Sequence, residues 1–224
     1  MIQLNKVSKR YAHGQEALLN ISLELKKGEM AFLTGHSGAG KSTLLKLITM
    51  MERASTGEVI FDGVNVNRIS KNKIPFLRRK IGIIFQDPHL LKDRSVFENV
   101  SLPLIITGYR YQDIGKRVRA ALDKVGLLHK ENVMPETLSS GEQQRIGIAR
   151  AIITKPPLII ADEPTGNLDP DLSQDIMQLF EQFNQIGSTV LIASHDIGLI
   201  NQLQHRRLTL KGGQLIRDEE GYMV

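Results

Sequence analysis

The most informative absence in this sequence is cysteine, of which the 224 residues contain none. Disulfide bonds, thiol chemistry and cysteine-ligated zinc are therefore excluded. The sequence also lacks the run of about 18 apolar residues that a membrane-spanning helix requires, since its apolar run at 102–106 is far too short. Residues 1–6 contain no uninterrupted apolar segment, so we expect no signal peptide. Any role at a membrane should therefore come through a partner or a surface contact.

Aromatic residues are also scarce, at 5% of the chain, and this scarcity bears on the most basic segment. That segment contains Arg68, Lys71, Lys73, Arg78, Arg79 and Lys80 without an intervening acid. Such a segment could face anionic lipid headgroups or nucleic acid, but a solvated surface is the simpler interpretation. Too few aromatics accompany these bases to form a stacking platform, so we expect no nucleic-acid partner.

What the sequence does contain is a phosphate-binding loop at 35–42, which matches G-x-x-x-x-G-K-[ST] at every fixed position. An apolar strand pattern precedes it at 30–34, and a helical pattern follows at 42–48. A strand, a glycine turn and a helix N-terminus together direct backbone N–H groups at one point, which suits the polyphosphate of ATP or GTP. We expect the glycines to keep side chains out of the path of the phosphates. Lys41 would reach the β- and γ-phosphates, and Ser42 would bind Mg²⁺.

The remaining patterns predict an α/β fold. Strands are expected at 2–8, 17–25, 58–61, 81–85, 158–163, 189–193, 206–210 and 214–217, with turns at 54–57 and 62–63. Residues 111–128 have apolar positions at helical spacing, and 95–133 should be mostly helical. We therefore expect one domain over 1–224, with a RecA-like core and an antiparallel β subdomain formed by 1–94 and 134–224. Residues 95–133 would form an inserted helical subdomain, and the acidic tail at 218–220 should be disordered or loosely docked.

Polar residues stand at the ends of three predicted buried strands. Gln86 follows the strand at 81–85, Asp162 and Glu163 end the strand at 158–163, and His195 follows the strand at 189–193. Such positions line ligand sites in α/β folds. Asp162 would hold Mg²⁺, and Glu163 would polarise the attacking water. Taken singly, Gln86 would be an exposed loop residue and His195 a structural histidine, but the neighbouring motifs favour a functional role for His195.

A capping box is predicted where Ser139 precedes Glu142 by three residues, ahead of a helical pattern. The pattern is typical of an ordinary well-capped helix, and it is equally typical of a second helix N-terminus that receives phosphate. Capping chemistry alone does not separate these two interpretations.

These motifs, taken in order, resemble those of ABC-transporter-type ATPases over about residues 1–210. The segments correspond to Walker A at 35–42, the Q-loop at Gln86, the signature at 138–144, Walker B at 158–163, the D-loop at 167–169 and the H-loop at His195. The resemblance implies ATP hydrolysis by a homodimer, because the signature and the P-loop serve one site only when they come from opposing chains. The signature departs from the usual L-S-G-G-Q at Ser140 and Glu142.

The resemblance also completes the set of expected site residues. Nucleotide is expected to bind Tyr11, which would stack on adenine, and Gly35, His36, Ser37, Gly38, Ala39, Gly40, Lys41, Ser42, Thr43, Ser139, Gly141 and Glu142. The expected catalytic residues are Lys41, Gln86, Glu163 and His195, and the expected Mg²⁺ ligands are Ser42, Gln86 and Asp162. On spacing alone, Tyr11 would be a packing residue.

Within this family, residues 162–169 resemble the branch that contains lipoprotein-release and macrolide-type exporters and bacterial cell-division ATPases. Residues 34–41, 75–79 and 179–184 are most similar to the cell-division ATPases. That similarity implies an integral membrane subunit as partner, peripheral attachment at the cytoplasmic face of the inner membrane, and indirect control of cell-wall hydrolases. The alternative is the ATPase motor of a lipoprotein-release or macrolide-type exporter. Leu90, Leu91, Val96 and Phe97 are expected to include residues of a groove for a short helix of that subunit. For Val96, packing in the subdomain's own core is an equally good interpretation.

Overall fold

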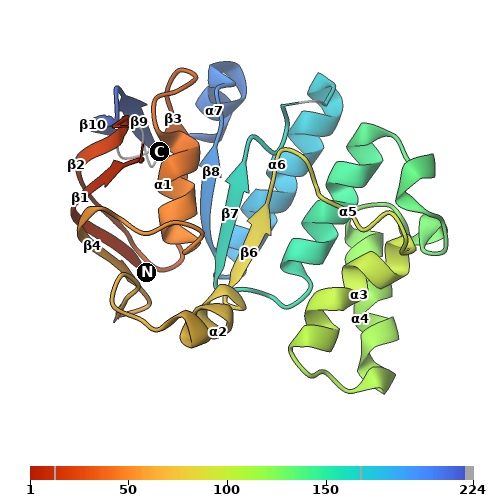
Figure 1. Ribbon diagram of the computed structural model, residues 1–224. Helices are drawn as coiled ribbons and strands as arrows, with labels where there is room; N and C mark the ends of the chain where they lie inside the picture. Colours follow the sequence, from red (N-terminus) through yellow and green to blue (C-terminus); the bar gives the residue numbers. More distant parts are fainter. Residues whose placement is uncertain (13, 167, 220–224) are drawn as a thin grey trace.

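The computed structural model describes residues 1–12, 14–166 and 168–219. Its centre is a mostly parallel sheet of strand order β10-β9-β3-β8-β7-β6 (Figure 1). The strands are β3 (Met30–Thr34), β6 (Ile81–Ile84), β7 (Leu158–Asp162), β8 (Thr189–Ala193), β9 (Arg206–Lys211) and β10 (Gln214–Glu219). β3 pairs in parallel with β8 and β9, and β7 with β6 and β8. The carboxyl ends of β3, β6, β7 and β8 therefore meet at one edge.

A second sheet is antiparallel and has the order β2-β1-β4-β5. It consists of β1 (Ile2–Arg10), β2 (Glu16–Leu25), β4 (Thr56–Phe61) and β5 (Val64–Asn65). Helix α1 (Lys41–Ile48) lies between this sheet and the central strands (Figure 1). Its apolar residues Leu44, Leu45, Leu47 and Ile48 are buried in a core shared with β1, β2, β3 and β8. This packing fixes the position of the loop that precedes α1.

The other face of the central sheet is covered by helices. They are α5 (Ser140–Ile152), α6 (Pro170–Gln185) and α7 (Ile197–Leu203), and the short α2 (Ile74–Arg78) lies before β6. Helices α3 (Val96–Ile106) and α4 (Tyr111–Lys124) lie beyond α5, away from the sheet (Figure 1). Short 3₁₀ turns occupy Lys71–Lys73, Leu128–Lys130 and Pro135–Thr137. α5 packs against α3, α4 and β6, so it joins the helices of 95–133 to the sheet. In the described part of the chain, no helix is both long and apolar enough to cross a membrane.

The α/β class and both kinds of sheet are confirmed, and most predicted elements are found within a few residues of their expected bounds. The strand predicted at 81–85 ends at Ile84, and the helix predicted to 128 ends at Lys124. The exact domain boundaries remain a prediction.

The turn predicted at 54–57 is wrong in its second half, because Thr56 and Gly57 begin β4. Gly57 has φ +82°, and a Cβ there would lie 2.3 Å from the carbonyl oxygen of Lys6. A glycine in a strand thus marks close approach of the neighbouring strand rather than a turn.

The acidic tail is also ordered where the structure describes it, contrary to expectation. Asp218 and Glu219 belong to β10, and Asp218 accepts two hydrogen bonds from Arg206, at 2.7 and 2.8 Å. Glu220 lies outside the described residues. The same Arg206 donates to Glu29 at 2.6 Å, which ties the C-terminal hairpin to the start of β3.

The basic segment is only partly a solvated surface. Arg68 pairs with Glu58, and Lys80 with Asp62. Arg78 donates to the carbonyl oxygens of Thr49 and Met50 at the end of α1. Half of the bases therefore stabilise local structure, because they bind groups of the chain itself.

Candidate functional site

The P-loop connects β3 to α1 and adopts a conformation that requires glycine. Gly35, Gly38 and Gly40 have φ values of +145°, +78° and +107°. A Cβ on Gly35 would lie 2.4 Å from the Leu210 carbonyl oxygen, and one on Gly40 would lie 2.7 Å from that of Ala17. The expectation that these glycines keep side chains away from phosphates is therefore incomplete, since neighbouring backbone already excludes a side chain at two of them.

The N-terminus of α1 and Lys41 present positive charge at this loop. Gly40 caps α1 without a side-chain hydrogen bond, and no acid lies in the first turn of the helix. The Lys41 ammonium donates to the Gly35 carbonyl oxygen at 2.7 Å and lies 3.9 Å from Oε1 of Glu163. Backbone N–H groups and an ammonium directed at one point are suited to an anion.

A cleft of about 650 Å³ opens over this loop. It is lined by Tyr11, Gln15, Glu16, Ala17, Ser37, Gly38, Ala39, Gly40, Lys41, Ser42, Thr43, Gln86, Asp162, Glu163 and His195. The Tyr11 hydroxyl lies 3.4 Å from Oγ1 of Thr43, and the Lys9 ammonium lies 5.0 Å from the centre of the Tyr11 ring. Tyr11 is therefore held at the mouth of the cleft.

Asp162 and Ser42 form the oxygen-rich floor of the cleft. Burial is the main cause that raises the Asp162 pKa above its ordinary 3.8, and the charge of Glu163 adds to it, whereas a hydrogen bond from Ser42 lowers it. A hydroxyl, a carboxylate and the nearby Gln86 amide are hard oxygen donors, and this donor set fits Mg²⁺. In the described residues, no group of three or more His, Asp or Glu could hold a metal by itself. The remaining ligands would come from phosphate and water.

Glu163 lies just beyond β7, and its position explains why both acids reach the same cleft. The strand ends at Asp162, and Glu163 turns back with φ +49° while its N–H donates to the Ala193 carbonyl oxygen at 2.9 Å. Its Oε2 lies 2.8 Å from Nδ1 of His195. The predicted end of the strand before Pro164 is confirmed, and the carboxylate is held between an imidazole and an ammonium.

Gln86 is exposed and lines the same cleft, as its place after β6 predicted. The backbone on both sides of Gln86, at Phe85 and at Pro88–His89, is hydrogen-bonded to side chains of α5. Nε2 of Gln144 donates to the Phe85 carbonyl oxygen at 3.1 Å, and the Arg150 guanidinium donates to the carbonyl oxygens of Pro88 and His89. These hydrogen bonds connect the position of this backbone to that of α5. The sequence patterns contained no signal for Arg150, whose role depends on contacts across 61 or 62 positions of the chain.

The signature residues lie at the N-terminus of α5, where the predicted capping box is confirmed. The Ser139 hydroxyl accepts from the Glu142 N–H, and the Glu142 carboxylate accepts from the Ser139 N–H at 2.9 Å and from its hydroxyl at 3.1 Å. Lys130 donates to the other Glu142 oxygen at 2.5 Å. These bonds, that of Lys130 first, lower the Glu142 pKa to about 2. The sequence patterns did not indicate that Lys130 pairs with Glu142.

The structure does not bring these signature residues into the P-loop cleft. Ser139, Gly141 and Glu142 are absent from its lining, and α1 and α5 lie on opposite sides of β6 and β7 in Figure 1. Of the D-loop, Asn167 lies outside the described residues, while Asp169 caps α6 by accepting from the Leu172 N–H at 2.9 Å. In one chain, Ser139, Gly141 and Glu142 therefore lie outside the cleft that contains Lys41.

A P-loop before α1 and two adjacent carboxylates at the end of β7 define a P-loop nucleoside-triphosphate-binding cassette. A profile of the family described as ABC transporter matches residues 18–166. The chain belongs to this family, and the resemblance found in the sequence is confirmed.

Within this family, the chain is similar to ATP-binding proteins of bacterial cell division. The chain is 57% identical to the cell division ATP-binding protein FtsE of Escherichia coli strain K12, over 96% of this chain and 97% of the relative. It is 43% identical to FtsE of Bacillus subtilis strain 168, over 98% and 96% of the two chains. Among solved structures, it resembles a dimeric ATP-binding cassette in a post-hydrolysis state with ADP and Pi, with TM-score 0.93, 36% identity and full coverage of both chains.

Proposed function

We propose that this chain is the ATP-hydrolysing subunit of a membrane complex that acts in bacterial cell division. The observation that carries the proposal is the grouping of Lys41, Glu163 and His195 in one cleft, in a chain 57% identical to a cell-division ATP-binding protein. The similarity to FtsE supports this role over that of a lipoprotein or macrolide export motor. ATP binding and hydrolysis would control cell-wall hydrolases through the membrane partner.

ATP would bind with its base against Tyr11 and its phosphates over the N-terminus of α1. The Lys41 ammonium would give up its hydrogen bond to the Gly35 carbonyl oxygen and donate to phosphate oxygens instead, because the phosphates would bind at the same loop. Ser42, Asp162 and Gln86 would hold Mg²⁺, which neutralises phosphate charge when bound.

Glu163 would orient the attacking water and accept its proton. Because His195 holds the carboxylate through Oε2, Oε1 is the oxygen directed toward Lys41 and the phosphate site. Water would attack the γ-phosphorus, the bond to the bridging oxygen would break, and ADP and phosphate would be the products. Removing a positioned base typically costs 10²–10⁴ in rate.

We further propose that the working unit is a homodimer in the ATP state. Ser139 and Gly141 do not line the cleft that holds Lys41, so the γ-phosphate would meet them only on a second copy. A dimeric cassette of TM-score 0.93 supports this arrangement. Hydrolysis would then separate the two copies and move whatever α3–α5 bind.

The membrane partner would be an integral subunit of the FtsX type, which would hold this chain at the cytoplasmic face of the inner membrane. A cavity of about 480 Å³ beside the Gln86 segment is lined by Asp87, His89, Leu90, Lys92, Pro135, Glu136 and Gln143. Leu91 is 43% exposed beside it, whereas Val96 is fully buried and belongs to the subdomain core. The proposed groove therefore centres on Leu90, which lines the cavity, and on Leu91. Leu90 and Phe97 are both partly buried and pack against the core, but Phe97 does not line the cavity.

The variant Glu163→Gln tests the enzymatic part of the proposal. It should bind ATP normally, lose hydrolysis by about 10²–10⁴-fold, and elute as a dimer in size-exclusion chromatography with ATP. Asp175→Asn, on the exposed side of α6, is the matched control and should hydrolyse ATP at the parent rate. A Glu163→Gln chain that hydrolyses ATP normally, or stays monomeric at saturating ATP, would contradict the proposed site.

Co-purification tests the cell-division part. The chain is co-expressed separately with an FtsX-type membrane subunit and with a membrane subunit of a lipoprotein exporter. Retention of the first alone is expected, and retention of the second alone would assign the chain to export.

A further inference from the structure

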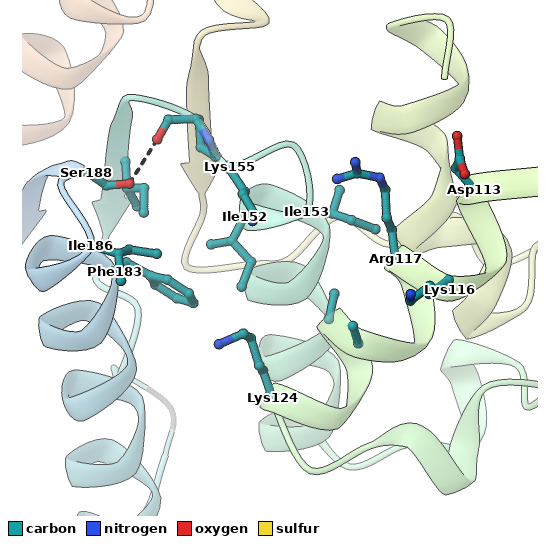
Figure 2. Close-up of a pocket in the computed structure, with 14 residues that line it drawn as sticks. Asp113, Lys116, Arg117, Lys124, Ile152, Ile153, Lys155, Phe183, Ile186 and Ser188 are labelled. Carbon is teal, nitrogen blue, oxygen red and sulfur yellow. Dashed lines mark hydrogen bonds between the residues drawn. The ribbon is translucent and has the colours of Figure 1, made fainter. Parts of the chain in front are cut away.

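A second cavity lies far from the nucleotide cleft, at the amino-terminal ends of β7 and β8 (Figure 2). Its volume is about 420 Å³, and its walls come from α4, the C-terminal turn of α5, residues 155–156 and the end of α6. Volumes of roughly 300–1,000 Å³ are typical of small-molecule sites. Because Asp162 and Glu163 lie at the other end of β7, an occupant of this cavity would not compete with ATP for space.

The floor of the cavity is apolar and belongs to the folded core. Ile152, Ile153, Ile159 and Phe183 are each at most 6% exposed, so their positions are fixed by packing. Ile186 stands at the rim and is 71% exposed. The cavity thus has a preformed apolar lining, and of the residues named Ile186 exposes the most apolar surface to water.

The rim is strongly basic. Lys116, Arg117 and Lys124 come from α4 and Lys155 from the turn after α5, and Figure 2 shows Ile152 between Lys155 and Lys124, with Phe183 to one side. Within the described residues, none of the four bases has a carboxylate within 4.0 Å, although Asp113 also lines the cavity. The Arg117 guanidinium lies 4.7 Å from the Tyr109 ring centre. Four bases against one acid leave a positive potential around an apolar floor.

We propose that this cavity binds a single-chain amphiphile with an anionic head, of the fatty-acid type. The alkyl chain would cover Ile152, Ile153 and Phe183, and the carboxylate would pair with a base of the rim. An anionic amphiphile fits both the apolar floor and the basic rim. A free phosphate would leave the apolar floor in contact with water, and a neutral hydrocarbon would leave the bases of the rim without a counter-charge. The inference goes beyond the proposed function and does not depend on it.

One other arrangement would produce the same picture without a ligand. Lysine and arginine stems can cover apolar surface while their charged ends stay in water, and such a rim would then only shield the floor. An acidic helix of another protein is the remaining alternative, but the walls come from several converging elements rather than from two parallel helices that form a long groove. Both alternatives make predictions that the following experiment separates.

The experiment is isothermal titration calorimetry of the full, nucleotide-free chain with decanoate below its aggregation concentration. We expect saturable binding at one site per chain. Octanoate should bind roughly 16-fold more weakly, because each buried methylene contributes about fourfold in affinity. Decyltrimethylammonium, which has the same chain and the opposite charge, should show no saturable binding.

Two variants locate the site. Ala120→Phe fills the cavity from an exposed position of α4 and should weaken decanoate binding at least tenfold, while Gln112→Phe adds the same ring elsewhere on that helix and should not. The double reversal Lys116→Glu/Arg117→Glu should also weaken binding, with the double reversal Lys71→Glu/Lys73→Glu, outside the cavity, as its matched control. Thermal melting checks that each variant is folded.

Absence of decanoate binding would overturn the proposal and leave the rim as a shield of lysine and arginine stems. Equal affinity of the parent and Ala120→Phe, or equal binding of the cationic amphiphile, would overturn it as well. Binding of an acidic amphipathic peptide in place of decanoate would assign the cavity to a protein partner instead.

Discussion

Replacement of Lys130 by methionine should weaken the ATP-dependent pairing of two chains, and Glu142→Gln in the same chain should restore it. Lys130 lies 2.5 Å from the Glu142 carboxylate, which also caps α5 through Ser139. With its pKa lowered to about 2, Glu142 is an anion at neutral pH. In the proposed dimer this anion faces the γ-phosphate bound by the other chain. Lys130 is then the charge that compensates it.

The size of the effect follows from the exposure of the pair. Two unit charges 4 Å apart interact by about 4 kcal/mol at an effective dielectric constant of 20. The side chains of Lys130 and Glu142 are 31% and 18% exposed, so solvent screens part of this interaction. We therefore expect about 1–2 kcal/mol, which corresponds to a fivefold to thirtyfold weaker dimer.

The assay is analytical ultracentrifugation with ATP, in the hydrolysis-deficient Glu163→Gln background. Lys130→Met should raise the dimer dissociation constant, Lys130→Arg should leave it near the parent value, and Lys130→Met/Glu142→Gln should return it there. Glutamine retains the capping box, so the double variant removes charge without removing the cap. An unchanged constant for Lys130→Met, or a double variant as weak as the single one, would refute this reasoning.

Three further predictions concern stability and coupling. Because burial raises the Asp162 pKa, the ionised form destabilises the fold, so Asp162→Asn should increase the free energy of unfolding of the nucleotide-free chain at neutral pH, as measured by urea unfolding. That gain should fade as the pH falls through the raised pKa, and a constant gain would contradict the assignment. Arg206→Met removes the ion-pair partner of Glu29 and Asp218. It should lower Tm by about 5–10 °C in calorimetry, for a loss of about 2–3 kcal/mol, and an unchanged Tm would contradict this role of Arg206. Leu91→Glu should abolish capture of the membrane subunit without changing basal ATPase activity, and loss of both would place Leu91 in the fold.

The parts of the site that the sequence predicted are those set by local pattern. Continuous apolar runs identified β3, β7 and β8, and because parallel strands end at one edge, the sequence alone was enough to place Gln86, Asp162 and His195 together. The capping box at Ser139 was equally local. Each strand and the capping box depend on residues that lie within a few positions of one another, and the parallel sheet then brings the strand ends together.

The features that the sequence did not predict depend on distant contacts. Arg206 joins Glu29 and Asp218 across 177 and 12 positions, and no local pattern indicates that this keeps the acidic tail in a strand. Lys130 neutralises Glu142 from a neighbouring turn, and the exclusion of a side chain at Gly35 comes from Leu210. Tertiary packing, rather than propensity, determines all of them.

The most direct test of the central claim mixes two inactive chains. Lys41→Ala removes the phosphate-binding charge and leaves the signature, whereas Ser139→Ala removes the signature hydroxyl and leaves the P-loop. Each alone should hydrolyse ATP poorly. In a mixed dimer, one site combines the intact P-loop of one chain with the intact signature of the other, so ATPase activity should rise above that of either variant, toward half the parent rate. Activity that stays at the sum of the separate variants, with mixed dimers present, would contradict a site shared between two copies.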